Sequence, residues 1–327
     1  MKISIIIPVY NASLTLKECL EAIFYSNLKN FEVIVVSDNS SDNSVEIAKQ
    51  FQCKIIELPQ NRGPGFARNE GGKTAEGDVL LFLDSDVIID KEALNPLSDK
   101  FSDNEVNVIQ GIYSHKPTYN IPTQYQQSFY CYYSWHSGMK YTSSLATNCF
   151  AIRRKIFIEL KGFNTNIKRA TSEDEEFGYM LINKGYKILI LRQLNGEHRV
   201  NYNLRKLIKR NFAIYIDTAK SYLRNKTYIK KVEQTNYWRV LGGIAIFGLI
   251  ILSLVGFIFF SSKLLWNIFL SLNIIFLMLH LSFIKFVGRA KGFLKALGVM
   301  IVCYIDAFIM LTSLFLGSLS YFFREKY

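Results

Sequence analysis

Hydrophobic positions follow two different patterns along the chain. Up to about residue 239, short apolar runs alternate with segments in which apolar residues recur at helical spacing. After residue 239 the chain is almost purely apolar. The first pattern predicts a soluble α/β part, and the second predicts a membrane part.

Four short apolar runs within residues 1–110 predict buried strands, and the segments between them predict helices. We expect strands at ISIIIPVY (3–10), FEVIVVS (31–37), CKIIELP (53–59) and DVLLFL (78–83). We expect helices at 13–26, 43–51 and 65–76, the first with Ser13 as its N-cap. Apolar strands separated by helices are typical of a mostly parallel sheet covered by helices on both faces.

Polar residues follow three of these strands, at the edge where such sheets bind ligands. They are Tyr10-Asn11, Ser37-Asp38-Asn39 and Asp84-Ser85-Asp86, and Arg68 lies in the segment between the last two. Carboxylates one residue apart repel each other inside a strand. At a strand end, Asp84 and Asp86 can bind Mg²⁺ or Mn²⁺ through oxygen while the metal bridges a diphosphate. The sequence therefore predicts a site for an anionic ligand and a hard cation.

Three long apolar runs, at 240–260, 264–284 and 296–322, predict membrane spans. Each has about the twenty residues needed to cross roughly 30 Å of hydrocarbon. The alternative is a set of buried core helices, but the three successive runs have almost no polar face. Asp306 is an ionisable residue in the middle of the third run. We expect it to pair with another span, at Asn273 or less readily His280, or to line a path for the polar head of a lipid acceptor.

The charge of the chain predicts its orientation. Its 39 Lys and Arg against 27 Asp and Glu give a net charge of +12. Many of these cations precede the first run, four lie between the second and third runs, and only Lys263 lies between the first and second. The positive-inside rule then predicts a cytoplasmic N-terminal part and an external C-terminus, which the tail REKY opposes. Because this charge lies beside the apolar runs, it favours a membrane over nucleic acid as the partner.

The segment NLRKLIKRNFAIYIDTAKSYL (203–223) carries an apolar stripe at helical spacing with basic residues beside it. This pattern favours an interfacial helix, with its apolar face in the acyl boundary and its basic face toward headgroups. The alternative is a helix packed on the soluble part. The five cysteines stand at no metal-ligand or redox spacing. We therefore expect them to be reduced and mostly buried, as at a cytosolic face.

Six motifs, in order, resemble the glycosyltransferase family 2 domain, which is the GT-A type of nucleotide-sugar transferase. They are SIIIPVYN (4–11), VVSDNSSD (35–42), NRGPGFARNEG (61–71), LFLDSDV (81–87), NCFAIRRKIFIELKGFN (148–164) and SEDEEFGYMLINKGYKI (172–188). The resemblance covers about residues 1–200. It implies a GT-A domain at 1–200, to which the patterns above add a basic interfacial region at 201–238 and a transmembrane region with three helices at 239–327.

The resemblance also implies roles for particular residues. Asp38 would accept a hydrogen bond from the base, and Arg68 would face the nucleotide and its diphosphate. Where the family often has a first acid, this chain has Ser37. Asp84 and Asp86 would hold ribose and Mn²⁺ or Mg²⁺, with His198 near the metal. The remaining nucleotide-sugar contacts would come from Pro8, Tyr10, Asn11, Asn61 and Ser85.

The Glu-Asp motif carries the mechanism that the resemblance implies. Asp174 matches the family's general base, and Glu173 lies beside it. A sugar or lipid hydroxyl is a poor nucleophile, so a carboxylate must take its proton as it attacks the anomeric carbon. The same acids could simply begin a helix, where negative charge is favoured. We expect an inverting hexosyl transfer from a nucleotide sugar, a UDP-sugar being favoured, to a lipid or lipid-linked hydroxyl on the cytoplasmic face of the membrane.

Three other functions stay open. A processive polysaccharide synthase would carry a Q-x-x-R-W motif before its channel helices, and this sequence has none. A polyprenyl-phosphate sugar synthase acts on an acceptor that is already ionised, and such family members typically lack the Glu-Asp motif. A catalytically dead nucleotide-binding membrane scaffold would have no need of Asp84, Asp86 and Asp174.

Overall fold

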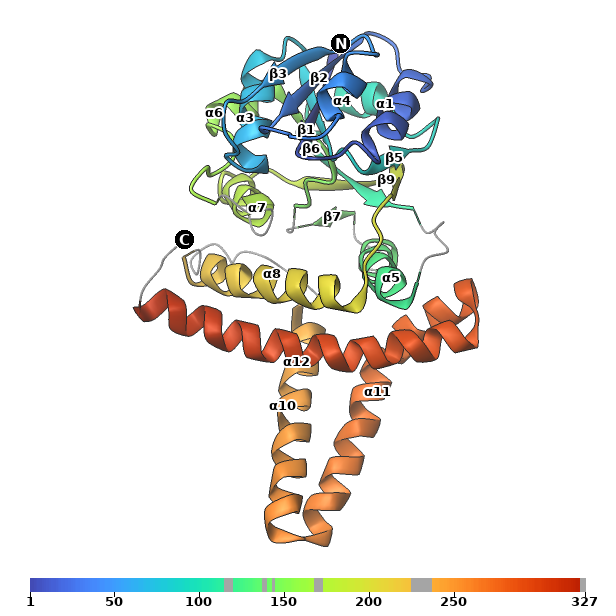
Figure 1. Ribbon diagram of the computed structural model, residues 1–327, viewed down its shortest axis with the longest axis vertical. Helices are drawn as coiled ribbons and strands as arrows, with labels where there is room; N and C mark the ends of the chain where they lie inside the picture. Colours follow the sequence, from blue (N-terminus) through green and yellow to red (C-terminus); the bar gives the residue numbers. More distant parts are fainter. Residues whose placement is uncertain (115–119, 137–139, 143–144, 168–172, 225–236, 324–327) are drawn as a thin grey trace.

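The computed structural model describes residues 1–114, 120–136, 140–142, 145–167, 173–224 and 237–323. Figure 1 shows an α/β domain above a group of long helices, two of which project away from it as a hairpin. Ser172 of the Glu-Asp motif, residues 225–236 of the expected interfacial region and the tail REKY lie outside the described residues.

One mixed sheet forms the centre of the α/β domain. Its first half has the order β3-β2-β1-β4 and is parallel, with β1 at Ile3–Val9, β2 at Phe31–Ser37, β3 at Lys54–Glu57 and β4 at Val79–Leu83. The order continues β8-β6-β9-β5, and β7 pairs with β9. These strands are β5 (Val87–Ile89), β6 (Val108–Tyr113), β7 (Tyr141–Thr142), β8 (Cys149–Arg153) and β9 (Ile188–His198).

The direction of the strands confirms the expected mostly parallel α/β fold. Strand β8 runs antiparallel to both β4 and β6, whereas β6 and β9 are parallel to each other. Strands β5 and β7 run antiparallel to β9. In the described sheet, β5, β7 and β8 therefore oppose the direction that the other strands share.

Helices cover both faces of the sheet because β1 alternates its side chains between them. Ile3, Ile5 and Ile7 pack with α1 (Leu16–Phe24) and α4 (Pro96–Ser102), whereas Ile6 packs with the helices of the other face. Those helices are α3 (Pro64–Thr74), α6 (Arg154–Glu159) and α7 (Glu173–Asn183). A Cβ on Gly71 of α3 would lie 2.4 Å from Ile6 Cγ2, so only glycine allows this approach. The short α2 (Ser44–Ala48) follows β2.

The predicted N-cap at Ser13 is wrong. Helix α1 begins at Leu16 after Thr15. The Ser13 backbone N–H instead donates to Asp42 Oδ2 at 2.9 Å. This bond ties the segment before α1 to the loop after β2, and no side chain caps the helix at Thr15.

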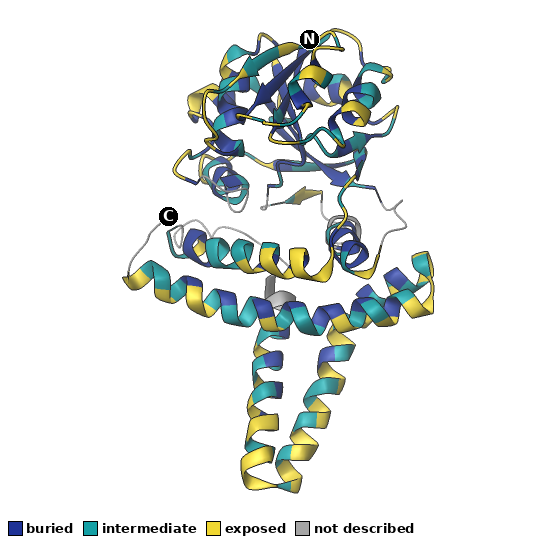
Figure 2. Ribbon diagram, viewed as in Figure 1, coloured by how far each residue is buried: buried dark blue, intermediate teal, exposed yellow. Residues whose placement is uncertain are grey.

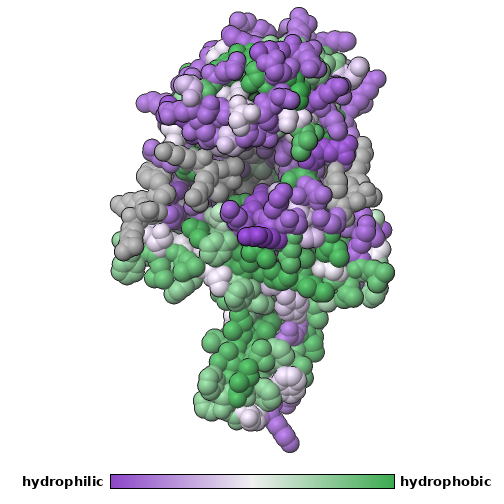
Figure 3. Space-filling model, viewed as in Figure 1, coloured by the Kyte–Doolittle hydropathy of each residue, from purple (hydrophilic) through white to green (hydrophobic). Residues whose placement is uncertain are grey.

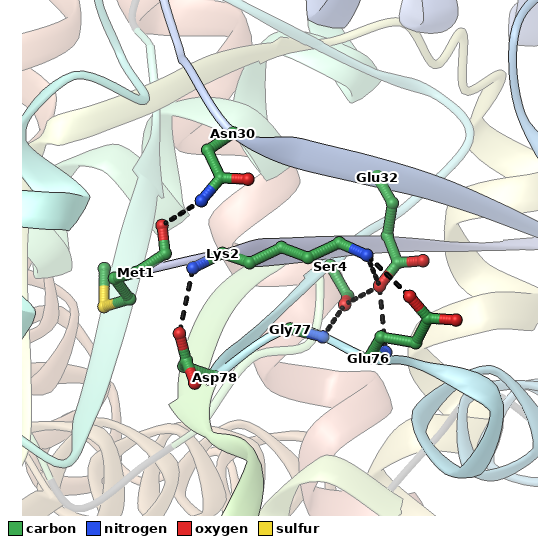
Figure 4. Close-up of polar contacts among 8 residues, drawn as sticks. All are labelled: Met1, Lys2, Ser4, Asn30, Glu32, Glu76, Gly77 and Asp78. Carbon is green, nitrogen blue, oxygen red and sulfur yellow. Dashed lines mark hydrogen bonds and ion pairs between the residues drawn. The ribbon is translucent and has the colours of Figure 1, made fainter.

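The end of the sheet opposite the strand-end motifs is held by a polar cluster (Figure 4). Ser4 Oγ donates to Glu32 at 2.6 Å and accepts from the Gly77 N–H at 2.8 Å. Lys2 Nζ lies 2.8 Å from Glu76, and the Lys2 N–H donates to Asp78 at 2.9 Å. These bonds join the starts of β1, β2 and β4, and so fix the register that aligns their other ends.

Four long helices complete the described chain. They are α8 (Leu204–Arg224), α10 (Tyr237–Phe260), α11 (Lys263–Lys291) and α12 (Phe293–Phe323). By length and composition, α10 from Gly242, α11 and α12 could each cross a membrane. Figures 2 and 3 show that the far part of the α10–α11 hairpin is largely exposed and apolar. The amphipathic α5 (Ile121–His136) lies between these helices and the sheet.

The expected partners of Asp306 are wrong. Its carboxylate accepts hydrogen bonds from the Tyr125 hydroxyl of α5 and from Asn211 Nδ2 and the Tyr215 hydroxyl of α8, each at 2.7 Å. Asn273 instead accepts from the Tyr304 hydroxyl at 3.1 Å. The acid therefore joins α12 to α8 and α5, and not to another apolar span.

The apolar stripe of α8 packs partly against α12 and is partly exposed to solvent. Tyr215 reaches Asp306, and Ile216 and Ala219 lie against Gly317 of α12. At its C-terminal end α8 is joined to α7 by an ion pair between Arg224 and Glu176. This end of α8 therefore contacts α12 and, through the ion pair, the soluble part. The interfacial position of its basic N-terminal half stays a prediction.

Candidate active site

Strand β4 ends at Leu83, and the next three residues leave the core. Asp84, Ser85 and Asp86 form a turn closed by the Val87 N–H donating to the Asp84 carbonyl at 3.1 Å. The Asp84 N–H still donates to the Asn148 carbonyl of the neighbouring segment at 3.1 Å. All five residues of β4 are buried, which holds both carboxylates at the strand end, as predicted.

Arg68 joins the strand-end motif to the Glu-Asp motif. Its guanidinium, 3% exposed, lies 2.7 Å from Asp84 Oδ1 and 3.1 Å from Glu173 Oε1. Burial alone would lower the pKa of Arg68, but the two carboxylates hold it above its ordinary value. Because both partners are anionic, the group of three keeps one net negative charge. The predicted contact of Arg68 with a diphosphate would therefore require further positive charge, which a divalent cation would supply.

His198 lies beside the second carboxylate of the strand-end motif. Its Nε2 is 3.2 Å from Asp86 Oδ2, and its ring stacks on Tyr113 with the centroids 4.7 Å apart. The His198 carbonyl accepts from Gln127 Nε2 at 2.8 Å. Burial would raise the pKa of Asp86, but His198 lowers it below its ordinary value. The pKa of Asp84 is raised by burial, against the opposing effect of Arg68.

Asp174 lies in the first turn of α7, directly after Glu173. Its Oδ1 accepts from the Glu175 N–H at 2.9 Å, as an acid at a helix N-terminus does. Burial first, and then the charges of Glu173 and Glu175, raise its pKa well above the ordinary aspartate value. Burial also raises the pKa of Glu175 to about 7. A carboxylate with a raised pKa is a stronger base, so the site suits proton acceptance at Asp174.

Asp38 organises the predicted nucleotide-binding loop. Its two carboxylate oxygens accept from the Arg62 and Gly63 N–H groups, each at 2.8 Å. The loop carrying Asn61 is thereby tied to the end of β2. Each carboxylate oxygen has a second lone pair, so a hydrogen bond from a base is still possible. That contact stays a prediction.

The other nucleotide-side residues gather at the ends of β1 and β2. Pro8 pairs in register with Val36, and Tyr10 is exposed. Asn11, at φ +51°, accepts from the Ser41 N–H at 2.8 Å through its side chain. Ser37 is buried, and its hydroxyl accepts from the Ser40 N–H at 3.3 Å. These contacts shape the loops around an exposed Tyr10 and Asn61.

A hard divalent cation fits the donors at the strand end. Asp86 offers carboxylate oxygen beside the His198 imidazole, and Asp84 keeps one oxygen that Arg68 does not contact. Within the described ranges, no three Asp, Glu, His or Cys side chains are grouped as a complete metal site. A cation held here would thus need oxygen ligands from a diphosphate or from water, as Mg²⁺ commonly takes.

Sequence reasoning missed three residues that complete the site. Tyr113 ends β6 and supports the His198 ring, while Gln127 of α5 holds the His198 backbone. Arg210 of α8 contacts the Tyr130 hydroxyl at 3.4 Å and helps to lower the pKa of Asp86. Tyr113 could have been found, because it is another polar residue at a strand end. Gln127 lies on α5, which was not predicted. Arg210 lies on α8, which was predicted as a helix, but the local pattern does not show that it packs near the active site.

Comparison with known proteins agrees with this geometry. The family described as "Glycosyl transferase family 2" matches residues 4–161. The poly(ribitol-phosphate) beta-glucosyltransferase of Bacillus spizizenii is 38% identical over 119 residues, which are 34% of this chain and 19% of that protein. Glycosyltransferase GlyA of Streptococcus pneumoniae is 36% identical over 116 residues, 34% of this chain and 17% of that protein. The chain thus matches less than a fifth of either relative.

A solved structure shares the fold. The mannosyltransferase PcManGT from Pyrobaculum calidifontis, in complex with GDP-Man and Mn²⁺, superposes with a TM-score of 0.60 at 15% identity. The match covers 99% of this chain and 88% of that one. The family match, the GT-A-like sheet and the strand-end acids agree, and residues 4–161 are identified as a glycosyl transferase family 2 domain.

Proposed function

We propose that this protein is a membrane-bound inverting glycosyltransferase. It transfers a sugar from a nucleotide diphosphate sugar, with a UDP-sugar as the favoured donor, to a hydroxyl of a lipid or a lipid-linked glycan. One observation carries the proposal: Arg68 bridges Asp84 of the strand-end motif and Glu173 of the Glu-Asp motif. Donor-side and acceptor-side acids therefore share one site.

The donor would lie along the ends of β1, β2 and β4. Asp38 and the loop that it holds would face the nucleoside, and Asp84, Ser85 and Asp86 would face the ribose and diphosphate. Mn²⁺ or Mg²⁺ held at Asp84, Asp86 and His198 would neutralise charge on the departing diphosphate. The Mn²⁺ complex of the Pyrobaculum mannosyltransferase is in keeping with this use of metal.

Asp174 would accept the acceptor's proton. As the acceptor oxygen forms its bond to the anomeric carbon, the bond from that carbon to the diphosphate breaks on the opposite face. The diphosphate leaves with the electron pair, and the hydroxyl proton passes to the Asp174 carboxylate. The raised pKa of Asp174 supports this role, because it makes the carboxylate a stronger base.

The position of the site supports a lipid-linked acceptor. Helices α5 and α8 lie between the sheet and the apolar helices (Figure 1). Gln127 of α5 bonds the His198 carbonyl, and the charge of Arg210 of α8 helps to lower the pKa of Asp86. An acceptor anchored in the membrane would therefore reach the site from the side of α5 and α8.

The decisive experiment offers membranes containing the full chain a panel of nucleotide sugars together with extracted lipids. The panel comprises UDP-glucose, UDP-galactose, UDP-N-acetylglucosamine and GDP-mannose, with products read by mass spectrometry. We expect one donor to yield a glycosylated lipid whose new sugar is attached through a hydroxyl. Membranes containing Asp174→Asn are the matched control and should lack this product.

Two results would contradict the proposal in different ways. Tight nucleotide-sugar binding without sugar release or transfer would indicate a nucleotide-binding scaffold. A product carrying the sugar on a polyprenyl phosphate, formed equally well by Asp174→Asn, would indicate the phosphate-acceptor alternative.

A further inference from the structure

Helix α12 differs from α10 and α11 in its direction. Figure 1 shows it lying across α10 and α11 and running alongside α8. The middle of α12 meets both hairpin helices: Tyr304 bonds Asn273 of α11 and packs against Phe247 of α10. A neighbouring span would instead contact the hairpin along its length.

The last turns of α12 lie on α8. A Cβ added to Gly317 would lie 2.6 Å from the Ile216 carbonyl oxygen and 3.0 Å from Ala219 Cβ, so the two helix backbones are in close contact there. The far end of the hairpin closes on itself, with the rings of Phe257 and Trp266 4.9 Å apart. If α12 crossed the membrane antiparallel to α11, its last turns would instead lie beside Trp266.

The polar face of α12 points toward the α/β domain. Asp306 is 4% exposed and takes all three of its described hydrogen bonds from α5 and α8. A carboxylate in the middle of a spanning helix is costly in hydrocarbon. At the domain side of α12 the same carboxylate is satisfied by three donors outside the hairpin.

The opposite face of α12 is apolar and exposed. Leu297, Ile301, Phe308, Phe315 and Phe322 recur at intervals of four or seven residues, which places them on one side of the helix. They are 43–67% exposed. This face is continuous with the exposed apolar surface of the hairpin (Figure 3).

We infer that α12 lies in the plane of the membrane surface, with this apolar face against the acyl chains of the leaflet nearest the catalytic domain. Only α10 and α11 then cross the bilayer. Phe323, the last described residue, returns to the side of the catalytic domain, so the chain has two spans where its hydropathy predicted three.

Dimensions and charge agree with this arrangement. The apolar part of α10, Gly242–Phe260, has 19 residues and measures about 28 Å, enough to cross the hydrocarbon once. The cations in the last two turns of α11 (Lys285, Arg289 and Lys291) and in the first turn of α12 (Lys295) would lie at the headgroups of that same leaflet. The acyl boundary is therefore the occupant that fits the exposed face.

Depth measurements on single spin labels would test the inference. The full chain, with its five cysteines replaced and nucleotide-sugar turnover retained, receives one new cysteine at Ile301, Phe308 or Phe315. Each step of seven residues is about 10.5 Å along the helix. After reconstitution into phosphatidylglycerol–phosphatidylethanolamine vesicles, collision with oxygen and with a water-soluble nickel complex reports the depth of each label.

We expect equal shallow depths for the three labels on α12. Labels at Leu252 and Phe259 of α10, also seven residues apart and exposed, form the matched control and should differ in depth by roughly 10 Å. Depths that change steadily from Ile301 to Phe315, as along α10, would overturn the inference.

A reporter fusion gives an independent test that leaves the native cysteines in place. A fluorescent protein fused after the last residue should fluoresce, and alkaline phosphatase fused there should be inactive, as for a cytoplasmic terminus in a bacterial host. Alkaline phosphatase inserted between Ser261 and Ser262, at the hairpin loop, should be active. An active phosphatase at the C-terminal position would establish three spans and refute the in-plane helix.

Discussion

At the scale of single residues, the site depends on the buried guanidinium of Arg68, which pairs with two carboxylates at once. Arg68 contacts Asp84 and Glu173, so the strand-end acids and the Glu-Asp helix are held at a fixed separation. Breaking a buried ion pair leaves an uncompensated charge and is strongly destabilising. Asp84→Ala would therefore lose stability as well as ligand binding. Asp86, whose described side-chain partner is His198, is the better residue with which to test metal use.

We predict that Asp86→Ala abolishes turnover that depends on a divalent cation, while the protein still folds. The substitution removes a hard oxygen donor beside His198 and leaves the Arg68 ion pairs intact. The measurement is sugar-transfer rate against Mn²⁺ and Mg²⁺ concentration. Asp99→Ala, on the exposed surface of α4, serves as the control and should behave as the native protein. An Asp86→Ala protein with native metal dependence would exclude this carboxylate as a ligand.

We predict that Asp174→Asn lowers transfer to the acceptor by about 10²–10⁴-fold, the usual contribution of a general base. Nucleotide-sugar affinity should change little, because the amide keeps the size of the side chain and the donor-side residues are untouched. Single-turnover transfer and equilibrium binding of the donor measure the two effects. Near-native transfer by this variant would show that the base lies elsewhere.

The pH dependence of transfer should identify the same base. Burial and the neighbouring glutamates raise the pKa of Asp174 well above 3.8, and only its deprotonated form accepts a proton. Activity should therefore be full above that raised pKa and be lost as the pH falls through it. The quantity to follow is kcat/KM between pH 4 and 9. Glu175→Gln, which removes the adjacent acid with a pKa of about 7, should keep an acidic limb; its disappearance would assign the limb to Glu175.

At the scale of elements, the sequence predicted those helices and strands that are defined by a local hydrophobic pattern. The strands β1, β2 and β4 are continuous apolar runs, so their positions and the acids after β2 and β4 followed directly from the residues. Strand β3 has no buried residue, so the expectation of a buried strand is wrong there. Strand β8 enters between β4 and β6, and His198 reaches Asp86 across 112 positions of the chain. Such pairings depend on the topology of the sheet, and the hydrophobic periodicity of a short segment contains no information on which distant segments pair. Helix α5 was missed because tyrosine and glutamine occupy most of the positions that face its neighbours.

The contact between α12 and α8 could not be predicted from local sequence pattern either. Hydropathy identified α12 as an apolar helix but contains no information on its direction, and Asp306 has partners on helices 91–181 residues away. The expectation of a partner on another span led to Asn273, which lies on α11 and not on α5 or α8. Three donors around one carboxylate instead make Asp306 the polar contact that fixes α12 to α8 and α5.

We predict that Asp306→Leu lowers the free energy of unfolding by about 2–5 kcal/mol, because three buried donors lose their acceptor. Asp306→Asn should cost less, about 1–2 kcal/mol, since its one oxygen can still serve the two tyrosine hydroxyls. Thermal unfolding in detergent, followed by circular dichroism, compares them. Thr312→Val, on the same helix, removes a hydroxyl that bonds only to α12 itself and should have little effect. If Asp306→Leu is as stable as Thr312→Val, Asp306 has no structural role.

At the scale of the whole molecule, the basic residues decide which side of the membrane holds the active site. Arg205, Lys206 and Lys209 are exposed on α8, on the side of the hairpin nearest the α/β domain, whereas Lys263 is the one cation at the hairpin's far end within the described chain. The positive-inside rule predicts from this distribution that the α/β domain faces the cytoplasm. Nucleotide sugars are charged and cross a bilayer poorly, so this orientation is necessary for a donor made in the cytoplasm to reach Asp84 and Asp86.

We predict that intact inside-out membrane vesicles turn over an added nucleotide sugar, whereas sealed right-side-out vesicles do so only after detergent opens them. The reason is geometric: the strand-end acids, Arg68 and Asp174 all belong to the α/β domain, so the side of that domain is the side of donor access. Sugar incorporation into lipid is measured in both preparations, with Asp174→Asn vesicles as the background. Equal rates in sealed vesicles of both kinds would indicate leaky preparations, which an enclosed dye detects. Activity confined to sealed right-side-out vesicles would place the catalytic domain outside, and the charge argument would then be wrong for this chain.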